Sequence, residues 1–279
     1  MKLLIVDGSN LLFQMFFGMP ARITGKNGRA IHGTLGFVGA LLKMIRMTGP
    51  THIAVLFDGE HSTPRNEMDA DYKAGRTDYS EVPDEETPFS QLPDIYAALD
   101  HLGIRHAETA GCEFDDWAAA YALAYGEKAD VIIASFDSDF FQLITDHVSV
   151  LRYRGDKTIL CGPGYIREKF DIEPSQYACF KSLTGDTADN IRGADKVGPK
   201  TAAALIRQFG SLEDILAHAE EIAKPSIRQS IIQNADRLRL NHRLIRLKGG
   251  ATLPFPIEQL ACTCGAAATR DVLRAIGLQ

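Results

Sequence analysis

The stretch VIIASFDSDFFQLI, residues 131–144, decides how the rest of the chain is interpreted. Its first four residues are apolar or small, and a short run of this kind is typical of a strand buried on both faces. Asp137 and Asp139 follow the run with one residue between them. Two neighbouring carboxylates repel each other unless a cation lies between them. The stretch therefore predicts a buried strand that ends at a cation site.

Similar apolar runs recur in the first part of the chain, and helical patterns alternate with them. The runs lie at 3–6, 53–57, 131–134 and 148–151, and the helical patterns at 34–47, 92–102 and 113–125. This alternation predicts an α/β domain with a largely parallel sheet, flanked by helices. After about Gly164 helical patterns predominate, and they predict a second, helical region with helices at 165–170, 175–183, 199–209, 211–218 and 227–247.

The composition is ordinary for a soluble globular protein, with 45% hydrophobic and 24% charged residues among 279. No run approaches the roughly 18 apolar residues of a membrane span. Asp7 ends the first apolar run too early for a signal peptide. Five cysteines, with Cys262 and Cys264 as the one close pair, predict inert thiols in a reducing compartment. We therefore expect a cytoplasmic protein with no membrane partner.

Aspartates follow three of the predicted strands. Asp7 and Asp58 follow the first two, and Asp137 with Asp139 follows the third. Ligand sites of parallel sheets lie beyond the carboxyl ends of the strands, so these side chains should converge. A single aspartate in such a place is more often a helix cap or a turn former. Three strands with the same feature favour a common site.

Two further motifs add acidic residues. CEFDDW, residues 112–117, opens a helical pattern, and TGDTADNIRG, residues 184–193, reads as a turn. The alternatives are a favourable charge at a helix N-terminus for the first motif and a polar turn for the second. Taken together, the candidate metal ligands are Asp7, Asp58, Glu113, Asp115, Asp116, Asp137, Asp139, Asp186 and Asp189.

An all-carboxylate site suits Mg²⁺ or Mn²⁺ and not zinc. Several carboxylates that share waters are typical of two cations about 4 Å apart, the arrangement that cuts phosphodiesters. Without these nine charges the formal net charge changes from −6 to +3, so the remaining surface permits a phosphate-backbone partner.

Five ordered stretches resemble a known family. They are LLIVDGSNLLF (3–13), LFDGEHSTPRNEMDADYKAGR (56–76), GCEFDDWAAAYA (111–122), IIASFDSDFFQLI (132–144) and LTGDTADNIRGADKVGPKTAAALI (183–206). They are similar to the bacterial and phage 5′ nucleases of the flap-endonuclease superfamily, which include the 5′-nuclease domain of DNA polymerase I and exonuclease IX-like proteins. All nine acidic positions of the family are present. Exonuclease IX-like proteins often lack the acids equivalent to Asp186 and Asp189, so this chain is expected to be a complete two-metal enzyme.

The resemblance implies a fold and a domain organisation. A PIN-like nuclease core would occupy residues 1–163, with an arch at about 62–90. A helix-hairpin-helix (H3TH) DNA-binding region would occupy 164–250, and a tail, 251–279, would pack back on the core. The arch is short and its distal part is acidic, which puts the threading of long single strands in doubt.

The resemblance also assigns roles to basic residues. Lys73 and Arg76, at i and i+3 of an expected helical face, would act with Asp137 in catalysis at the scissile phosphate. DNA contacts are expected from Arg65, Lys73, Arg76, Lys196, Gly198, Lys200 and Thr201. Potassium is expected at the main-chain carbonyls of Leu183, Thr184, Arg192, Ala194 and Val197. Where the family often has an arginine, this chain has Gln14.

The expected activity is metal-dependent hydrolysis of DNA at a 5′ end, flap or junction, giving 5′-phosphate products in DNA replication and repair. The protein would act as a monomer with no polymerase domain in the chain. A PIN-like ribonuclease would lack residues 183–205, and a phosphatase would need its Asp-x-Asp at the first strand, where Asp7 stands alone. A DNA-structure-binding protein with an inactive site is the remaining alternative, against which the complete set of acids argues.

Overall fold

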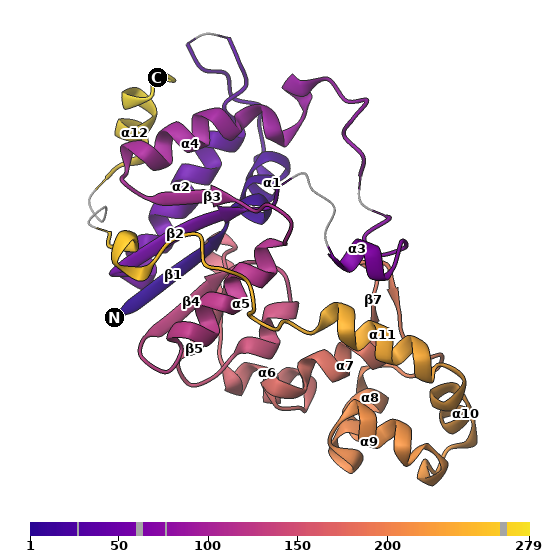
Figure 1. Cartoon of the computed structure of the whole chain (residues 1–279). Coiled ribbons are helices and arrows are strands. Elements are labelled where there is room, and N and C mark those ends of the chain that lie inside the picture. Colours follow the sequence, from indigo (N-terminus) through magenta and orange to yellow (C-terminus); the bar gives the residue numbers. More distant parts are fainter. Residues whose placement is uncertain (27, 60–63, 76, 263–266) are drawn as a thin grey trace.

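The computed structural model describes residues 1–26, 28–59, 64–75, 77–262 and 267–279. Its centre is a six-stranded sheet with the strand order β3-β2-β1-β4-β5-β6 (Figure 1). The strands are β1 (Lys2–Asp7), β2 (His52–Phe57), β3 (Arg105–Glu108), β4 (Asp130–Ala134), β5 (Val148–Arg152) and β6 (Ile159–Cys161). All pairs are parallel except β5 with β6. The predicted α/β class with a mostly parallel sheet is confirmed.

The four predicted strands are the four inner strands of the sheet, β2, β1, β4 and β5. The two edge strands were not predicted: β3 reads Arg-His-Ala-Glu and has no apolar run, and β6 reads Ile-Leu-Cys, which is apolar but only three residues long and exposed at two of them. In the register, Val6 pairs with Ala134, and Asp7 pairs with Leu56. The carboxyl ends of β1, β2 and β4 are therefore level, as the convergence of their aspartates requires.

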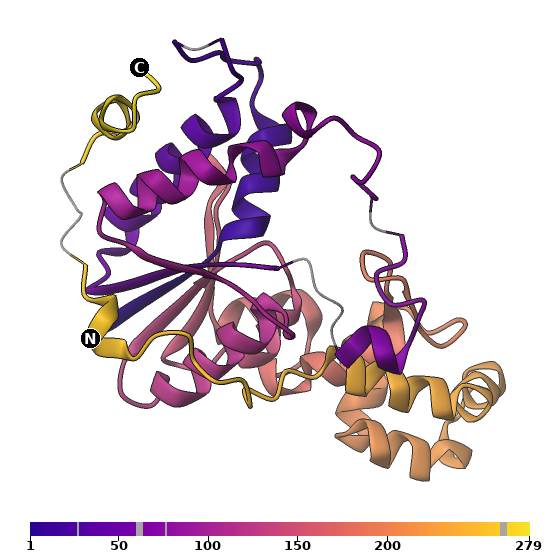
Figure 2. The same ribbon diagram turned by 45° about the horizontal axis from the view of Figure 1, so that its top comes forward.

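Each face of the sheet has its own hydrophobic core. Leu4 and Val6 of β1 belong to one core, and Leu3 and Ile5 to the other, because successive side chains of a strand point to opposite faces. The first face is covered by α1 (Gly8–Gly18), α2 (His32–Thr48), α4 (Leu92–His101) and α12 (Thr269–Ala275). The second is covered by α5 (Phe114–Tyr125), and its core continues into the helical region (Figures 1 and 2).

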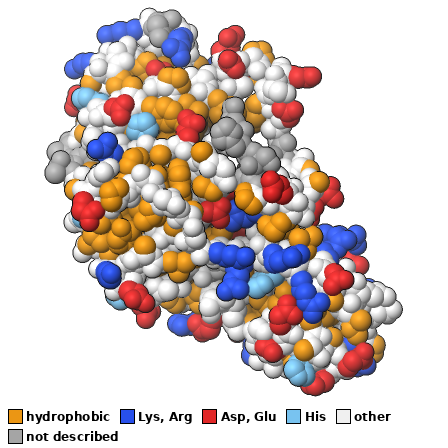
Figure 3. Space-filling model, in the orientation of Figure 1, with side chains coloured by type: hydrophobic (Ala, Val, Ile, Leu, Met, Phe, Trp, Pro, Cys, Tyr) orange, Lys and Arg blue, Asp and Glu red, His pale blue; other side chains and the backbone are white. Residues whose placement is uncertain are grey.

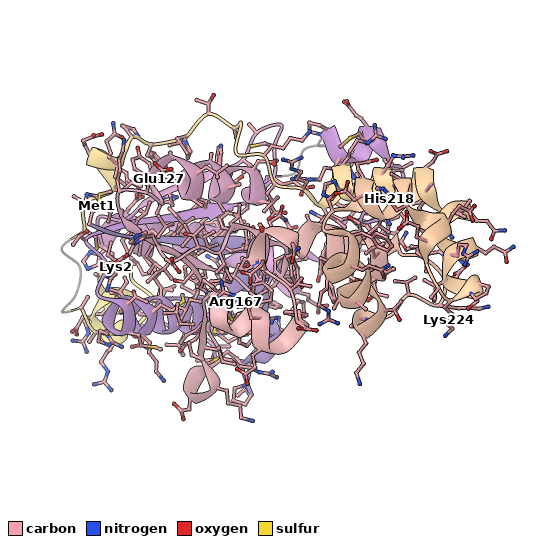
Figure 4. All side chains as sticks on the ribbon, turned by 90° about the horizontal axis from the view of Figure 1, so that it is seen from below. Met1, Lys2, Glu127, Arg167, His218 and Lys224 are labelled. Atoms are coloured by element: carbon pink, nitrogen blue, oxygen red, sulfur yellow. The ribbon has the colours of Figure 1, made fainter. Side chains whose placement is uncertain are left out.

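The helical region contains six helices and a two-stranded hairpin. They are α6 (Pro163–Phe170), α7 (Tyr177–Thr184), β7 (Gly185–Asp186), β8 (Ile191–Arg192), α8 (Pro199–Phe209), α9 (Leu212–Ala217), α10 (Pro225–Gln233) and α11 (Ala235–Ile245). In the view from below, Arg167 of α6 lies between the sheet domain, marked by Met1 and Glu127, and the part marked by His218 and Lys224 (Figure 4).

The single helix expected at 227–247 is wrong, because α10 and α11 are separate helices that meet at Asn234. The Asn234 side-chain amide donates to the Ser230 carbonyl, and such local bonds compete with the helical pattern. The break lets α11 turn back and pack against α7 (Figure 1).

Among its described residues, the expected arch segment has little regular structure. It begins with α3 (Pro64–Met68) and ends in two 3₁₀ turns, η1 (Asp84–Glu86) and η2 (Pro88–Gln91), before α4. The chain runs from α3, beside α11, across to the first face of the sheet domain (Figure 2). It therefore connects the helical region with the sheet domain over the carboxyl edge of the strands.

Cys262 is disulfide-bonded, so the expectation of free thiols is wrong at this residue, whereas Cys112, Cys161 and Cys179 are free. Cys264 lies outside the described residues. Among the helices that the structure describes, none has the length and apolarity to cross a membrane.

Candidate active site

A pocket of about 560 Å³ opens beyond the carboxyl ends of the strands. Its acidic lining is Asp7, Asp58, Asp115 and Asp137, called here the first carboxylate group. Asp7 ends β1, Asp58 follows β2, Asp137 follows β4, and Asp115 lies in the first turn of α5. Residues from four separate segments thus meet in one cavity, as the sequence predicts.

Backbone and hydroxyl groups hold the first group in place. Asp7 Oδ1 accepts a hydrogen bond from the Asn10 N–H at 2.9 Å and so caps α1. Asp7 Oδ2 accepts from Ser135 Oγ at 2.8 Å, and Asp58 Oδ1 accepts from the Phe114 N–H at 2.7 Å. These bonds fix the orientation of the Asp7 and Asp58 carboxylates, and each carboxylate keeps lone pairs that a cation in the pocket could use.

The pKa values of two acids in the first group are raised by burial and by the neighbouring carboxylates. Burial raises the pKa of Asp7 to about 7, and the charge of Asp58 adds to the rise. Burial also raises the pKa of Asp115 well above its ordinary value, with Asp137 as the strongest charged neighbour. Such shifts identify a place where negative charge is unfavourable without a cation, which is typical of a functional site.

A second carboxylate group consists of Asp139, Asp186 and Asp189. Among the described residues, this is the one set of three whose carboxylate oxygens lie within 4.8 Å of one another. Asp139 Oδ1 is buried and accepts no hydrogen bond of good geometry from the described part of the chain. A buried carboxylate oxygen of this kind, beside two further acids, fits a hard divalent cation. Asp137 and Asp139 join the two groups, because the Asp139 N–H donates to Asp137 Oδ1 at 2.8 Å.

Lys181 of α7 contacts the second group, and no pattern in the sequence pointed to it. Its ammonium lies 3.2 Å from Asp139 Oδ1 and donates to Asp186 Oδ2. Burial raises the pKa of Asp139 to about 7, the charge of Asp137 raises it further, and Lys181 opposes the rise.

Glu113 and Asp116 lie at the edge of the cluster and are held by Arg65. The Arg65 guanidinium is 3.0 Å from Glu113 Oε2 and 2.9 Å from Asp116 Oδ1, and its Nε donates to the Leu244 carbonyl. Arg65 is only 7% exposed. It joins α3 to α5 and α11, and a phosphate contact would require it to leave these partners. The DNA-binding role expected of Arg65 and the metal-binding roles of Glu113 and Asp116 stay predictions.

Lys73 lines the pocket, but not from a helix. α3 ends at Met68, and Lys73 lies in a turn with a left-handed φ of 59°, so the expected helical face shared with Arg76 is wrong. Arg76 itself lies outside the described residues. The Lys73 N–H donates to the Asp189 carbonyl at 3.0 Å, and its ammonium donates to Glu113 Oε2 at 2.7 Å. The start of the arch is thereby attached to the segment that carries the second group.

The hairpin and the start of α8 follow the second group. Lys196 has a left-handed φ of 64° and is exposed. Gly198 precedes α8, no side chain caps this helix, and Pro199 occupies its first turn. The N–H groups of Lys200 and Thr201 are therefore at a helix N-terminus, where a phosphate is stabilised. This placement agrees with the expected contacts of these four residues, which stay predictions.

The carbonyls expected to bind potassium lie around the same hairpin. The Leu183 carbonyl accepts from the Ala194 N–H, the Ala194 carbonyl accepts from the Val197 N–H, and the Arg192 carbonyl accepts from Asn241 Nδ2. Each carbonyl has a second lone pair. The roles of these residues and of Thr184 stay predictions.

Two further features of the surface were missed in the sequence. Phe13, Tyr79 and Phe89 line the pocket and contact one another edge to face, with ring centroids 5.6–5.9 Å apart. Lys and Arg side chains gather over α11 and the segment after it (Figure 3). The exposed basic residues there are Arg237, Arg239, Arg243, Arg246 and Lys248. Phe13 is far in sequence from Tyr79 and Phe89, so the aromatic trio forms no local motif, whereas the basic residues are concentrated in 237–248 and could have been found in the sequence.

Two models of known protein families match the chain, and together they cover nearly all of it. A family model described as 5′-3′ exonuclease, N-terminal resolvase-like domain, matches residues 2–171. A second, described as 5′-3′ exonuclease, C-terminal SAM fold, matches residues 172–267. The chain belongs to the 5′-3′ exonuclease family.

Curated relatives of this 5′-3′ exonuclease family member include DNA polymerases I. The chain is 34% identical over 265 residues to DNA polymerase I of Streptococcus pneumoniae, which covers 93% of the chain and 30% of the relative. It is 33% identical over 259 residues to the thermostable DNA polymerase I of Thermus thermophilus, covering 92% and 30%. The chain thus spans less than a third of the length of these relatives.

Solved structures share the fold. T5 5′-exonuclease, determined with divalent zinc ions, has a TM-score of 0.73 and 24% identity, and the match covers 99% of this chain and 100% of the other. The catalytic core of Rad2 in complex with a DNA substrate has a TM-score of 0.62 and 15% identity, covering 99% and 88%. The expected PIN-like core with a helical region is confirmed.

Proposed function

We propose that this chain is a structure-specific 5′ nuclease that hydrolyses DNA phosphodiesters with two Mg²⁺ or Mn²⁺ ions. The observation that carries the proposal is the arrangement of the acids. Four carboxylates line the pocket at the carboxyl edge of the sheet, and three more form the adjoining group. The two groups meet where the Asp139 N–H of the second donates to Asp137 Oδ1 of the first. Bound cations would supply positive charge to the phosphate and activate a water for attack.

The chain's own residues would position the substrate. Lys73 lines the pocket and would offset negative charge on the reacting phosphate, after exchanging its contact with Glu113 for the phosphate. Lys196 and the start of α8, from Gly198 to Thr201, would hold the duplex backbone at a distance from the reacting bond. Backbone contacts of this kind carry no sequence information, so DNA shape, such as a 5′ end, flap or junction, would be recognised.

Further expectations accompany this proposal. Products would carry a 5′-phosphate, the protein would act as a monomer, and potassium would bind at the hairpin carbonyls. The alternative, a DNA-structure-binding protein, requires the same backbone contacts but no cleavage. The raised pKa values of Asp7 and Asp115 mean that negative charge is unfavourable in the first carboxylate group without a cation, which supports a site that binds metal over an inactive one.

The experiment is cleavage of a 5′-flap duplex labelled at either end, in Mg²⁺, in Mn²⁺ and in EDTA. Asp137→Ala tests the site, and Asp146→Ala, at an exposed aspartate nearby in sequence, is the matched control. We expect cutting near the junction that needs metal, is lost in Asp137→Ala and is kept in Asp146→Ala. Tight flap binding with no product in either metal would instead establish the DNA-structure-binding protein.

A further inference from the structure

Lys181 is a buried lysine within the second carboxylate group, and its side chain is 10% exposed. Its ammonium lies 3.2 Å from Asp139 Oδ1, donates to Asp186 Oδ2 and donates to Ser138 Oγ at 3.3 Å. An ammonium has three donors. Two of them bond Asp186 and Ser138, and Asp139 Oδ1 lies within ion-pair distance. The ammonium is therefore surrounded by carboxylate and hydroxyl oxygens, an environment that favours a cation.

We propose that Lys181 is a built-in counter-cation, which holds the second carboxylate group together in the metal-free protein and competes with the divalent cation for the same oxygens. The proposal deepens the two-metal function proposed above and rests on it. It makes Lys181 a positioning residue that sets the affinity of one of the two cation sites.

The fold keeps the ammonium at this position. Lys181 lies in the last turn of α7, and the C-terminal end of a helix favours positive charge. α7 is itself fixed, because Asn241 Nδ2 of α11 donates to the Ser182 carbonyl at 3.1 Å. Tyr177, one turn earlier, is buried. The lysine thus projects from a packed helix, and its charge stays near the carboxylates in the absence of metal.

The contact between Lys181 and Asp139 is one that a divalent cation could replace. Asp139 Oδ1 has the ammonium nearby, yet among the described residues it receives no hydrogen bond of good geometry. Two cations in contact with the same carboxylate oxygens repel each other, so entry of a divalent cation requires the ammonium to withdraw. Ser138 Oγ, already within 3.3 Å, is an acceptor that the ammonium can keep when it does.

Isothermal titration of the full chain with Mn²⁺, without DNA, tests the proposal. In Lys181→Met, which keeps much of the stem and removes the charge, we expect the affinity for one of the two ions to rise at least tenfold. The other ion should bind as in the wild type. The control Lys128→Met removes an exposed lysine and should leave both affinities unchanged. Adding Asp189→Asn to Lys181→Met should remove the tightened ion and so assign it to the second group.

Thermal unfolding gives a second readout. Without metal, Lys181→Met should unfold at a lower temperature than the wild type, because Asp139 and Asp186 lose the ammonium that contacts them. Saturating Mn²⁺ should raise its unfolding temperature by more than it raises that of the wild type. If Lys181→Met does not fold without metal, Lys181→Gln, which keeps a hydrogen-bond donor, takes its place in both measurements.

Equal or weaker binding of both ions in the charge-removing variants would overturn the proposal. The titrations contain no DNA, so their outcome is separate from cleavage. A tightened ion in a protein that does not cut flaps would refute the nuclease and keep the role of Lys181. Flap cleavage with unchanged titrations would refute the role of Lys181 alone.

Discussion

The Arg65 guanidinium lies 3.0 Å from Glu113 Oε2, and both side chains are buried between α3, the arch and the start of α5. Asp116 Oδ1 is 2.9 Å from the same guanidinium. A buried charge that loses its partner destabilises the fold, because the desolvation cost of the remaining charge is no longer offset. Arg65 is thus placed to stabilise the joint between the sheet domain, the arch and the helical region.

Replacement of Arg65 should therefore reduce stability more than it reduces DNA affinity. We expect Arg65→Met to lower the free energy of unfolding by about 3–5 kcal/mol, measured by urea denaturation in EDTA. The control Arg274→Met, at an exposed arginine of α12, should change it by less than about 0.5 kcal/mol. A stable Arg65→Met protein with strongly weakened flap binding would show instead that Arg65 holds a phosphate.

Lys73 should affect catalysis more than stability. Its partner Glu113 keeps Arg65 when the lysine is removed, so the carboxylate remains compensated. We expect Lys73→Met to lower the single-turnover rate of flap cleavage by about 10²-fold or more, the size of effect seen when one charge-stabilising group is lost. Lys128→Met is the control. If the rate were retained in Lys73→Met, another cation would have to offset the phosphate charge.

Asp7 should make the metal-free protein less stable as the pH rises. Its pKa is raised to about 7 in the folded protein, whereas an unfolded aspartate ionises near its ordinary value of 3.8. Between these values the unfolded chain releases the proton and the folded chain keeps it, so the free energy of unfolding falls as pH rises toward 7. Above pH 7 the loss is complete.

Asp7→Asn removes this titration and should flatten the decline. Urea denaturation in EDTA at pH 5 and pH 8 would measure it, with Asp146→Asn, at an exposed aspartate, as the control. We expect Asp7→Asn to be more stable than the wild type at pH 8 and to lose flap cleavage. An identical pH dependence in the variant and the wild type would contradict the raised pKa of Asp7.

Features that depend on consecutive residues could be predicted from the sequence, whereas features that depend on contacts between distant residues could not. Strands 3–6 and 131–134 are buried on both faces and read as apolar runs, so the level ends that bring Asp7 and Asp137 together were predictable. β3 is partly exposed and carries no such run. Lys73 lies in a left-handed turn held by the Asp189 carbonyl, a contact with a residue far along the chain. Lys181 looks like any helical lysine until α7 is placed against the strand ends.

The hairpin before α8 should contribute to DNA affinity through charge alone. Lys196 and Lys200 are exposed there, and neutralising a phosphate releases counter-ions. We expect Lys196→Ala and Lys200→Ala each to weaken binding to flap duplexes of any sequence. Each should reduce the slope of log affinity against log salt by about 0.9. Fluorescence anisotropy across a salt series measures both, in EDTA or Ca²⁺ so that the DNA is not cut. Lys128→Ala should keep the wild-type slope, and loss of affinity for one sequence only would show base contacts instead.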